Sequence, residues 1–118
     1  IPSKRPLWMV ELPDQSVVGW VSFQSFYGRP AYDATVEISI YLEESMRGKG
    51  FGAQILQYCI GKAPALGIKT LLGFIFSHNE PSLKLFKRSG FDRLGKLPNV
   101  ASIDGQERSL SILGKRIG

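Results

Sequence analysis

The sequence contains only one cysteine and one histidine among its 118 residues, Cys59 and His78. A single cysteine excludes an internal disulfide framework and favours a reducing compartment, so we expect a cytoplasmic protein. No cysteine, histidine or acidic residues cluster with metal-site spacing, so we expect no metal cofactor. No apolar run approaches the roughly 20 residues that a membrane helix needs. These absences argue against a disulfide scaffold, a metal centre and a membrane-spanning protein.

The charge balance is basic, with a formal net charge of +5 and an isoelectric point of about 9.6. Such a surface suits a polyanionic partner, either nucleic acid or a small phosphorylated ligand. There is no dense run of lysine and arginine, so we expect no nucleic-acid partner and no membrane partner. The hydrophobic fraction of 43% is ordinary, and the length fits a single domain over residues 1–118.

Hydrophobic periodicity predicts six strands and two helices in the order β-β-β-α-β-α-β-β. Because helices alternate with strands only in the middle, we expect a mixed sheet in an α/β or α+β domain. Pro64 removes an amide, so the first helix should end or kink near Ala63. The predicted strands are 7–12, 17–26, 35–42, 69–76, 91–97 and 109–115, and the predicted helices are 50–66 and 81–89.

A glycine-rich turn between the third strand and the first helix carries the clearest chemical signal. Glycine lets the backbone pass close to a ligand, and the first amides of a helix have no partner inside it. This arrangement forms an anion cradle that suits a pyrophosphate, and two cations add positive charge. The turn consists of Arg47, Gly48, Lys49, Gly50, Phe51, Gly52 and Ala53.

Other readings of this turn are a helix cap with incidental glycines and a nucleotide-binding module of another fold. A Walker loop is excluded because Lys49 is followed by Gly50 rather than by serine or threonine. A dinucleotide fingerprint tolerates Ala53 as its last small residue, but it also needs an acid about 20 residues on. No acid is present around residues 71–73.

The turn resembles the acyl-CoA motif of the GNAT acetyltransferase superfamily, Arg/Gln-x-x-Gly-x-Gly/Ala. Arg47 and Gly50 fill its first positions, and Gly52 or Ala53 fills the last. Residues 79–91 resemble a second family segment, Asn-x-x-Ala/Ser followed by an aromatic residue and Gly-Phe. The resemblance implies a GNAT-like acyl-CoA N-acyltransferase fold with a mixed, mostly antiparallel sheet flanked by helices. It also implies acetyl-CoA as co-substrate and a primary amine as acceptor.

Residues 26–42 are similar to the phosphinothricin acetyltransferase branch of this family, which favours a small amino-acid-like acceptor. Branch members differ in their substrates, so an acceptor on a protein amine stays open. Family members usually carry a strand and one or two helices before the first hairpin seen here. We therefore expect the domain to be incomplete at its N-terminus, to bind acetyl-CoA weakly and to turn over poorly.

The resemblance also assigns roles to individual residues. Backbone groups of the third strand would pair with the pantetheine amides, the glycine-rich turn would hold the pyrophosphate, and the start of the second helix would reach the cofactor. Besides the turn residues 47–53, the implied cofactor-binding residues are Ile40, Tyr41, Leu42, Asn79, Ser82 and Phe86.

Glu37 is the candidate general base, because it interrupts an apolar run in a strand that we expect to be central. Many family members donate the proton for the leaving thiolate from a tyrosine, at a position that Phe86 occupies here. Water, Tyr32 or Tyr41 would then have to supply that proton. A non-catalytic acyl-CoA-binding or regulatory module is the alternative function, and a homodimer is compatible with the sequence.

Overall fold

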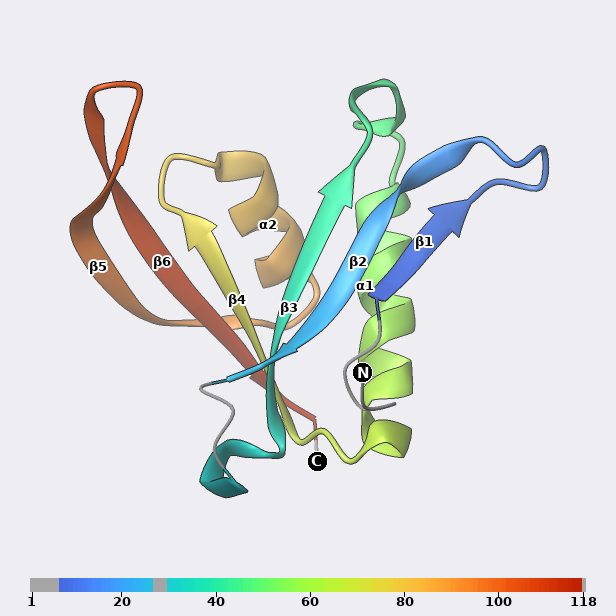
Figure 1. The fold of residues 1–118 in the computed structure, drawn as a ribbon, viewed down its shortest axis with the longest axis horizontal. Coiled ribbons are helices and arrows are strands. Elements are labelled where there is room, and N and C mark those ends of the chain that lie inside the picture. The colour runs from blue at the N-terminus through green and yellow to red at the C-terminus, as the bar shows by residue number, and fades with distance from the viewer. Residues whose placement is uncertain (1–6, 27–29, 118) are drawn as a thin grey trace.

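The computed structural model describes residues 7–26 and 30–117, which form six strands and two α-helices (Figure 1). Short 3₁₀ turns at Pro30–Tyr32, Glu44–Met46 and Ala63–Leu66 connect some of them. The number and order of strands and helices agree with the sequence prediction. Their bounds are β1 Leu7–Glu11, β2 Val17–Ser25, β3 Thr35–Leu42, α1 Phe51–Lys62, β4 Thr70–Phe76, α2 Glu80–Arg88, β5 Asp92–Ile103 and β6 Gln106–Arg116.

The strands form one mixed sheet in the order β1-β2-β3-β4-β6-β5. Only β3 and β4 run parallel, and every other neighbouring pair is antiparallel. Figure 1 shows both helices behind the sheet, so one face is covered by α1 and α2. This architecture confirms the predicted mixed, mostly antiparallel sheet of an α+β domain.

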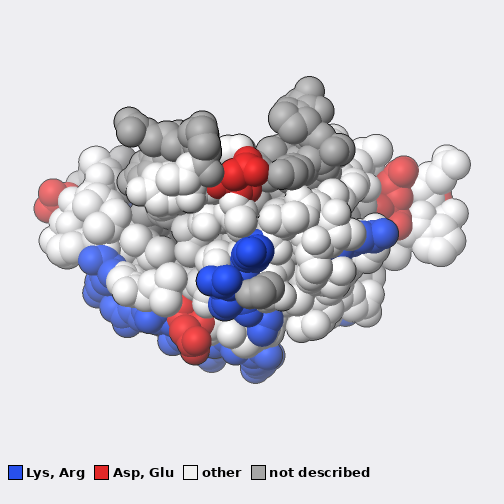
Figure 2. All heavy atoms as spheres, turned by 90° about the horizontal axis from the view of Figure 1, so that it is seen from below, with Lys and Arg blue, Asp and Glu red and all other residues white. Residues whose placement is uncertain are grey.

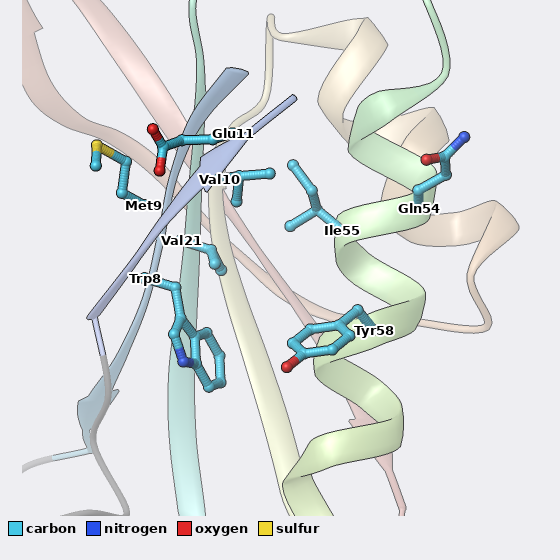
Figure 3. Close-up of a pocket in the computed structure, with 8 residues that line it drawn as sticks. All are labelled: Trp8, Met9, Val10, Glu11, Val21, Gln54, Ile55 and Tyr58. Atoms are coloured by element: carbon cyan, nitrogen blue, oxygen red, sulfur yellow. The ribbon is translucent and has the colours of Figure 1, made fainter. Parts of the chain in front are cut away.

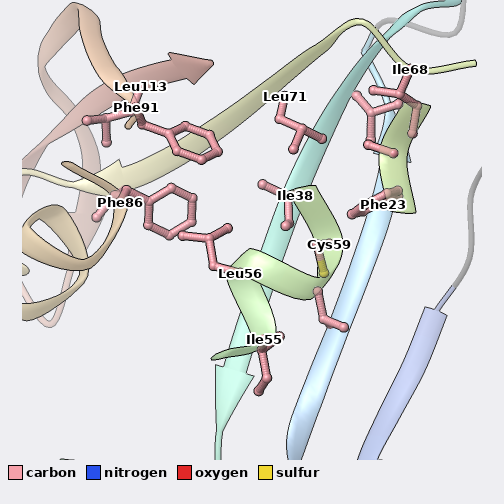
Figure 4. Close-up of a cluster of buried hydrophobic side chains, with 14 of the residues drawn as sticks. Phe23, Ile38, Ile55, Leu56, Cys59, Ile68, Leu71, Phe86, Phe91 and Leu113 are labelled. Carbon is pink, nitrogen blue, oxygen red and sulfur yellow. The ribbon is translucent and has the colours of Figure 1, made fainter. Parts of the chain in front are cut away.

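The hydrophobic core lies between this covered face and the two helices (Figure 4). Side chains of α1 and α2 pack there against those of β2, β3, β4 and β6, and the exposed fraction of each buried residue is at most 9%. Cys59 is fully buried in this layer. Core residues from each element include Phe23, Ile38, Leu56, Leu71, Leu83, Phe86 and Leu113.

The first helix ends where Pro64 predicted. α1 stops at Lys62, and the chain continues as a 3₁₀ helix over Ala63–Leu66, because Pro64 has no amide to donate within an α-helix. Gly67 closes this turn in the left-handed conformation, with φ 76°. Gly90 follows α2 with φ 93°, the left-handed conformation in which a glycine ends a helix, in agreement with the predicted helix end at residue 89.

The last two strands are longer than predicted. The predicted segments 91–97 and 109–115 left a long loop between them, whereas β5 continues to Ile103 and β6 begins at Gln106. Asp104-Gly105 joins them as a two-residue turn with φ 51° and 77°, the geometry of a type I′ hairpin. Asp-Gly is a strong hairpin signal, so this turn was readable from the sequence.

Pro98 and Asn99 are the reason that the pattern looked broken. The pairing register between β5 and β6 shifts between Leu97 and Ala101, and Asn99 takes a left-handed φ of 51°. The amide of Asn99 donates to the hydroxyl oxygen of Ser109 at 3.1 Å. The strand therefore absorbs these residues as a bulge and continues beyond them.

Among the described residues, no helix covers the other face of the sheet, which is called the open face below (Figure 1). Along β3, Val36 and Ile38 are buried against the helices, so Glu37, Ser39 and Tyr41 point to the opposite face.

Figure 2, viewed from below, shows lysine and arginine gathered over part of the surface, in keeping with the net charge. No helix among the described residues is long and apolar enough to cross a membrane.

Candidate active site

The central feature of the site is a gap between the two parallel strands. β3 and β4 pair only from Thr35–Glu37 to Thr70–Leu72, although β3 continues to Leu42 and β4 to Phe76. Figure 1 shows the two strands moving apart beyond this short pairing. Peptide groups on the inner edges of the gap therefore lack a strand partner, and an extended ligand can supply one.

The direction of each peptide group along β3 follows from one hydrogen bond. The amide of Glu43 donates to the carbonyl of Val18 on β2 at 2.8 Å. Because peptide groups alternate in direction along a strand, those of Tyr41 also point towards β2. The peptide groups of Leu42 and Ile40 point the other way, into the gap.

The glycine-rich turn lies at the open end of this gap, directly after β3. Gly48 and Gly50 both take left-handed conformations, with φ 74° and 84°, and an added Cβ at either would meet no atom within 4 Å. These glycines are therefore required by backbone conformation rather than by crowding. Lys49 between them is exposed.

The first amides of α1 are not capped by a side chain. Gly50 is the N-cap and provides no side-chain cap, so the amides of Phe51, Gly52 and Ala53 have no partner inside the helix. The first helical amide with a backbone partner is that of Gln54, which donates to the Gly50 carbonyl at 3.3 Å. The positive end of the helix dipole adds to the attraction for an anion.

Arg47 connects the turn to the end of β3. Its Nε donates to the Leu42 carbonyl at 3.2 Å, and its guanidinium lies 5.9 Å from the centre of the Tyr41 ring. The Leu42 carbonyl is thereby occupied, while Ile40 has no such partner from Arg47. Of the backbone groups at 40–42 that were predicted to contact the cofactor, those of Ile40 and the Leu42 amide face the gap, whereas those of Tyr41 face β2 and its ring is exposed.

Gly52 allows close packing between the two helices. A Cβ added to Gly52 would lie 3.0 Å from Leu85 of α2 and 3.6 Å from Leu42 of β3. The start of α1 is thus held against the edge of the gap. Asn79 caps α2, because its side-chain oxygen accepts from the Ser82 amide at 3.3 Å.

Phe86 lies in the core beside the gap. Its ring is 5% exposed and makes an edge-to-face contact with Phe91, with the ring centres 4.9 Å apart. A Cβ added to Gly73 would lie 2.7 Å from this ring, so the ring rests directly on the backbone of β4. Gly73 is the first β4 residue after the last pair with β3.

Glu37 lies at the last paired position before the gap, on the open face of the sheet. It is half-buried, with Gln24 of β2 opposite it on one side and Leu72 of β4 on the other. A strand advances about 3.3 Å per residue, so Glu37 and Ile40 are roughly 10 Å apart along β3. The carboxylate and the gap-facing peptide groups are therefore near one another without being in contact.

An aromatic cluster between β4 and the β2–β3 connection adjoins this position, and the sequence pattern did not identify it. Phe74 follows Leu72 on the same face of β4, and its ring centre lies 6.5 Å from that of Phe26. Phe26 in turn contacts Tyr32 edge to face at 5.4 Å. No local pattern brings these residues together. Residues 27–29 of the branch-like segment 26–42 lie outside the described part.

A pocket of about 380 Å³ lies elsewhere, between β1 and α1 on the helix side of the sheet. In Figure 3 the side chains of Trp8, Val10, Ile55 and Tyr58 point towards it, whereas Glu11 points away. None of the predicted cofactor-binding residues lines this pocket. Within the described ranges, no group of three or more histidine, cysteine or acidic residues could hold a metal ion.

Residues 2–91 match the model of the "Acetyltransferase (GNAT) family". A Bacillus subtilis protein named "Putative phosphinothricin acetyltransferase YwnH" is 50% identical over 113 residues, which cover 96% of this chain and 69% of that protein. The "L-methionine sulfoximine/L-methionine sulfone acetyltransferase" of Pseudomonas aeruginosa is 34% identical over 97 residues, covering 82% of this chain and 56% of that protein. The chain thus spans between about half and two thirds of these relatives.

Solved structures show the same fold. A crystal structure described as a "putative phosphinothricin N-acetyltransferase" matches with a TM-score of 0.95 and 48% identity, covering 98% of this chain and 73% of that one. A protein from Salmonella typhimurium described as "a putative ACETYLTRANSFERASE" and solved "with its cofactor Acetyl-CoA" matches with a TM-score of 0.91 and 26% identity, covering 97% of this chain and 65% of that one.

Proposed function

Because the chain belongs to the GNAT acetyltransferase family, we propose that it transfers the acetyl group of acetyl-CoA to the primary amine of a small amino-acid-like acceptor. The observation that carries this proposal is the gap between β3 and β4, which opens beside an uncapped helix start. The resemblance found in the sequence is confirmed at the level of family and fold. The roles of individual residues stay predictions.

Acetyl-CoA would occupy the gap as an additional strand. The amide and carbonyl of Ile40 and the amide of Leu42, which face the gap, would pair with pantetheine. Its pyrophosphate would lie on residues 47–53, where Gly48 and Gly50 allow a close approach. This placement orients the thioester towards the narrow end of the gap, where the two strands begin to pair.

The reaction is a direct attack of the amine on the thioester carbonyl. The nitrogen–carbon bond forms, the carbon–sulfur bond breaks, and coenzyme A leaves as a thiolate. The amide of Ile40 would donate to the carbonyl oxygen as negative charge develops there, which can lower the barrier by roughly 3 kcal/mol. The amine must lose one proton, and the thiolate must gain one.

Glu37 would accept the proton of the amine. A direct contact with a thioester at Ile40 is too far at roughly 10 Å along the strand, so a water molecule would relay the proton. Phe86 has no proton to give, and its ring is enclosed by Gly73 and Phe91. The thiolate would therefore be protonated by solvent, with exposed Tyr41 or Tyr32 as alternatives.

The acceptor would lie on the open face, next to Glu37. This region joins the polar pair Gln24 and Glu37 to the aromatic cluster of Phe26, Tyr32 and Phe74. A polar group beside an apolar wall suits a small zwitterion with a short side chain. Relatives named for phosphinothricin and for methionine sulfoximine support this class.

The decisive experiment measures release of the coenzyme A thiol with acetyl-CoA and a panel of acceptors. The panel contains phosphinothricin, methionine sulfoximine, methionine sulfone, a polyamine and a peptide with a free N-terminus. We expect turnover with the amino-acid analogues. Turnover only with the peptide would instead favour a protein amine as acceptor. The cytoplasmic location is a separate prediction, which this assay does not test.

A pair of variants separates an enzyme from a non-catalytic acyl-CoA-binding module. Glu37→Gln should lower kcat by about 10²-fold or more while leaving acetyl-CoA affinity unchanged. Glu11→Gln is the matched control, because Glu11 is exposed on β1, away from the gap. Acetyl-CoA binding without thiol release for any acceptor would support the non-catalytic module.

A further inference from the structure

Arg108 on β6 carries a charge that the described part of the chain leaves without a full set of partners. Its side chain is half-buried, and its Nε atom is enclosed with no hydrogen-bond partner among the described residues. A buried donor that stays unpaired is costly, and more so in a charged group, so such an atom in a native structure requires an explanation. No step of the reaction proposed above uses Arg108.

The strand neighbours of Arg108 supply no negative charge. It lies opposite Ala101 of β5, and its diagonal neighbour on β4 is Phe76, which pairs with Leu110. The ring of Phe76 stacks on that of His78, with the ring centres 5.8 Å apart. These neighbours are apolar or aromatic, so no acid at these positions balances the guanidinium.

Arg108 lies on the open face of the sheet, which is also the face of Glu37. Side chains alternate along β6, and Leu113 is buried against the helices, so the even-numbered residues of this strand point the other way. The start of α1, which would hold the pyrophosphate, lies on the helix side (Figure 1). A ligand that reaches Arg108 therefore approaches from the side of the acceptor.

The strand register gives the length of an acceptor that could reach both positions. β3 and β4 are paired up to Glu37 and Leu72, and a thioester at Ile40 would lie three residues further along. Leu72 pairs with Gly114 of β6, and Arg108 lies six residues beyond that pair. The thioester and Arg108 thus differ by three residues, roughly 10 Å along the sheet. This is too far for a carboxylate on the carbon that carries the amine, but an arginine side chain can meet a group several bonds further away.

We propose that Arg108 binds an acidic group at the end of the acceptor that is remote from its amine. The inference rests on the proposed function and adds a residue that selects among amine acceptors. A guanidinium stays charged and binds a carboxylate through two parallel hydrogen bonds. Phe74 and Phe76 follow Leu72 on the open face of β4, so the carbon chain of such an acceptor would lie over their rings.

The first test measures binding without catalysis. Glutamate and glutamine differ only in the charge of the group remote from the amine, and their affinities are compared by NMR titration. Excess coenzyme A is present, because it has no acetyl group to transfer. We expect glutamate to bind at least about tenfold more tightly than glutamine, as a hydrogen bond to a charged group would produce. Arg108→Gln should remove this preference and leave the affinity for glutamine unchanged.

Arg93→Gln is the matched control for this titration. Arg93 is an exposed arginine of β5 that lies opposite Leu113, on the helix side, so its loss should leave the glutamate preference intact. Arg108→Lys keeps the charge but not the two parallel hydrogen bonds, so its preference should lie between those of the unmodified chain and Arg108→Gln. Equal affinities in the unmodified chain, or a preference that persists in Arg108→Gln, would overturn the proposal, as would its loss in Arg93→Gln.

The second test distinguishes the acceptor from the phosphates of the cofactor. The affinity for coenzyme A is measured for the unmodified chain and for Arg108→Gln, and we expect no difference. Weaker coenzyme A binding with the glutamate preference intact would assign Arg108 to a phosphate and overturn the proposal. Thiol release tests the proposed function separately. A glutamate preference that depends on Arg108, without thiol release for any acceptor, would refute the transfer reaction but not the anion site.

Discussion

Two glycines offer a direct test of the proposed anion cradle. Gly50 and Gly61 both lie near solvent, and an alanine Cβ at either would meet no atom within 4 Å. They differ in backbone conformation, because Gly50 is left-handed with φ 84° and ψ 1°, whereas Gly61 lies inside α1. Alanine substitutions at the two positions therefore differ only in the backbone conformation of the new residue and in whether its methyl group enters the proposed ligand site.

The expected changes in stability have opposite signs. An alanine at Gly50 would be held in the left-handed region, which costs roughly 1–2 kcal/mol. Its smaller loss of chain entropy returns part of this, so the net destabilisation is about 1 kcal/mol. An alanine at Gly61 should stabilise the helix by about 0.5–1 kcal/mol. The variants should therefore differ by roughly 2 kcal/mol, or several degrees in Tm for a domain of this size.

The assay is thermal unfolding with and without acetyl-CoA. A ligand at one hundred times its Kd raises the free energy of unfolding by about 2.7 kcal/mol. We expect Gly61→Ala to keep this increase and Gly50→Ala to lose most of it, because the methyl group would occupy the pyrophosphate position. An unchanged acetyl-CoA response in Gly50→Ala would refute the cradle, and a lower Tm for Gly61→Ala would refute the reasoning on backbone conformation.

Three further outcomes follow from single contacts. Arg47→Lys loses the Nε bond to Leu42 and should raise the KM for acetyl-CoA by about fivefold with little change in kcat, measured by steady-state kinetics. Phe86→Tyr would place a hydroxyl beside Gly73 and should leave kcat nearly unchanged, because the thiolate is proposed to depart without an acid; a rise towards the roughly 10²-fold of general acid catalysis would show that thiolate protonation limits the rate. Burial raises the pKa of the Cys59 thiol from its ordinary value of 9.0 to about 12. The thiol therefore ionises first in the unfolded chain, so the free energy of unfolding should fall as the pH rises from 9 to 12. Alkylation of Cys59 should be slow in the native protein and fast in denaturant, and rapid native alkylation would contradict this assignment.

Most of the helix ends and strand faces that were predicted correctly depend on local features of the sequence. Pro64 set the end of α1, Gly90 set the end of α2, and alternating apolar residues set the face of β3. These features depend on backbone conformation or on side-chain periodicity, which act within a few residues. The hairpin turn at Asp104-Gly105 belongs to the same class, but the bulge at Asn99 obscured it.

The site depends on contacts that no local pattern contains. The pairing of β3 with β4 ends at Glu37 and Leu72, which are far apart in sequence. The cluster of Phe26 and Phe74 likewise joins a loop to a later strand. The glycine-rich turn indicated an anion site from sequence alone, but only the fold places Glu37 at the narrow end of the gap. The sequence therefore predicted candidate residues one by one, whereas their arrangement in space required the fold.

Phe86 occupies the position where many family members have a tyrosine. It shows that packing beside the gap does not require a side chain that can donate a proton. The ring rests on Gly73, which is the first β4 residue after the strands stop pairing, and its other side packs on Phe91. Any side chain at Gly73 would collide with the ring, so the close contact between α2 and β4 needs a flat aromatic ring and a glycine together. A phenylalanine fulfils this packing role as well as a tyrosine, while removing the hydroxyl that would protonate the thiolate. Under the proposed function, the packing that would seat the cofactor is kept, and the last proton would come from solvent, since a thiolate can depart without an acid.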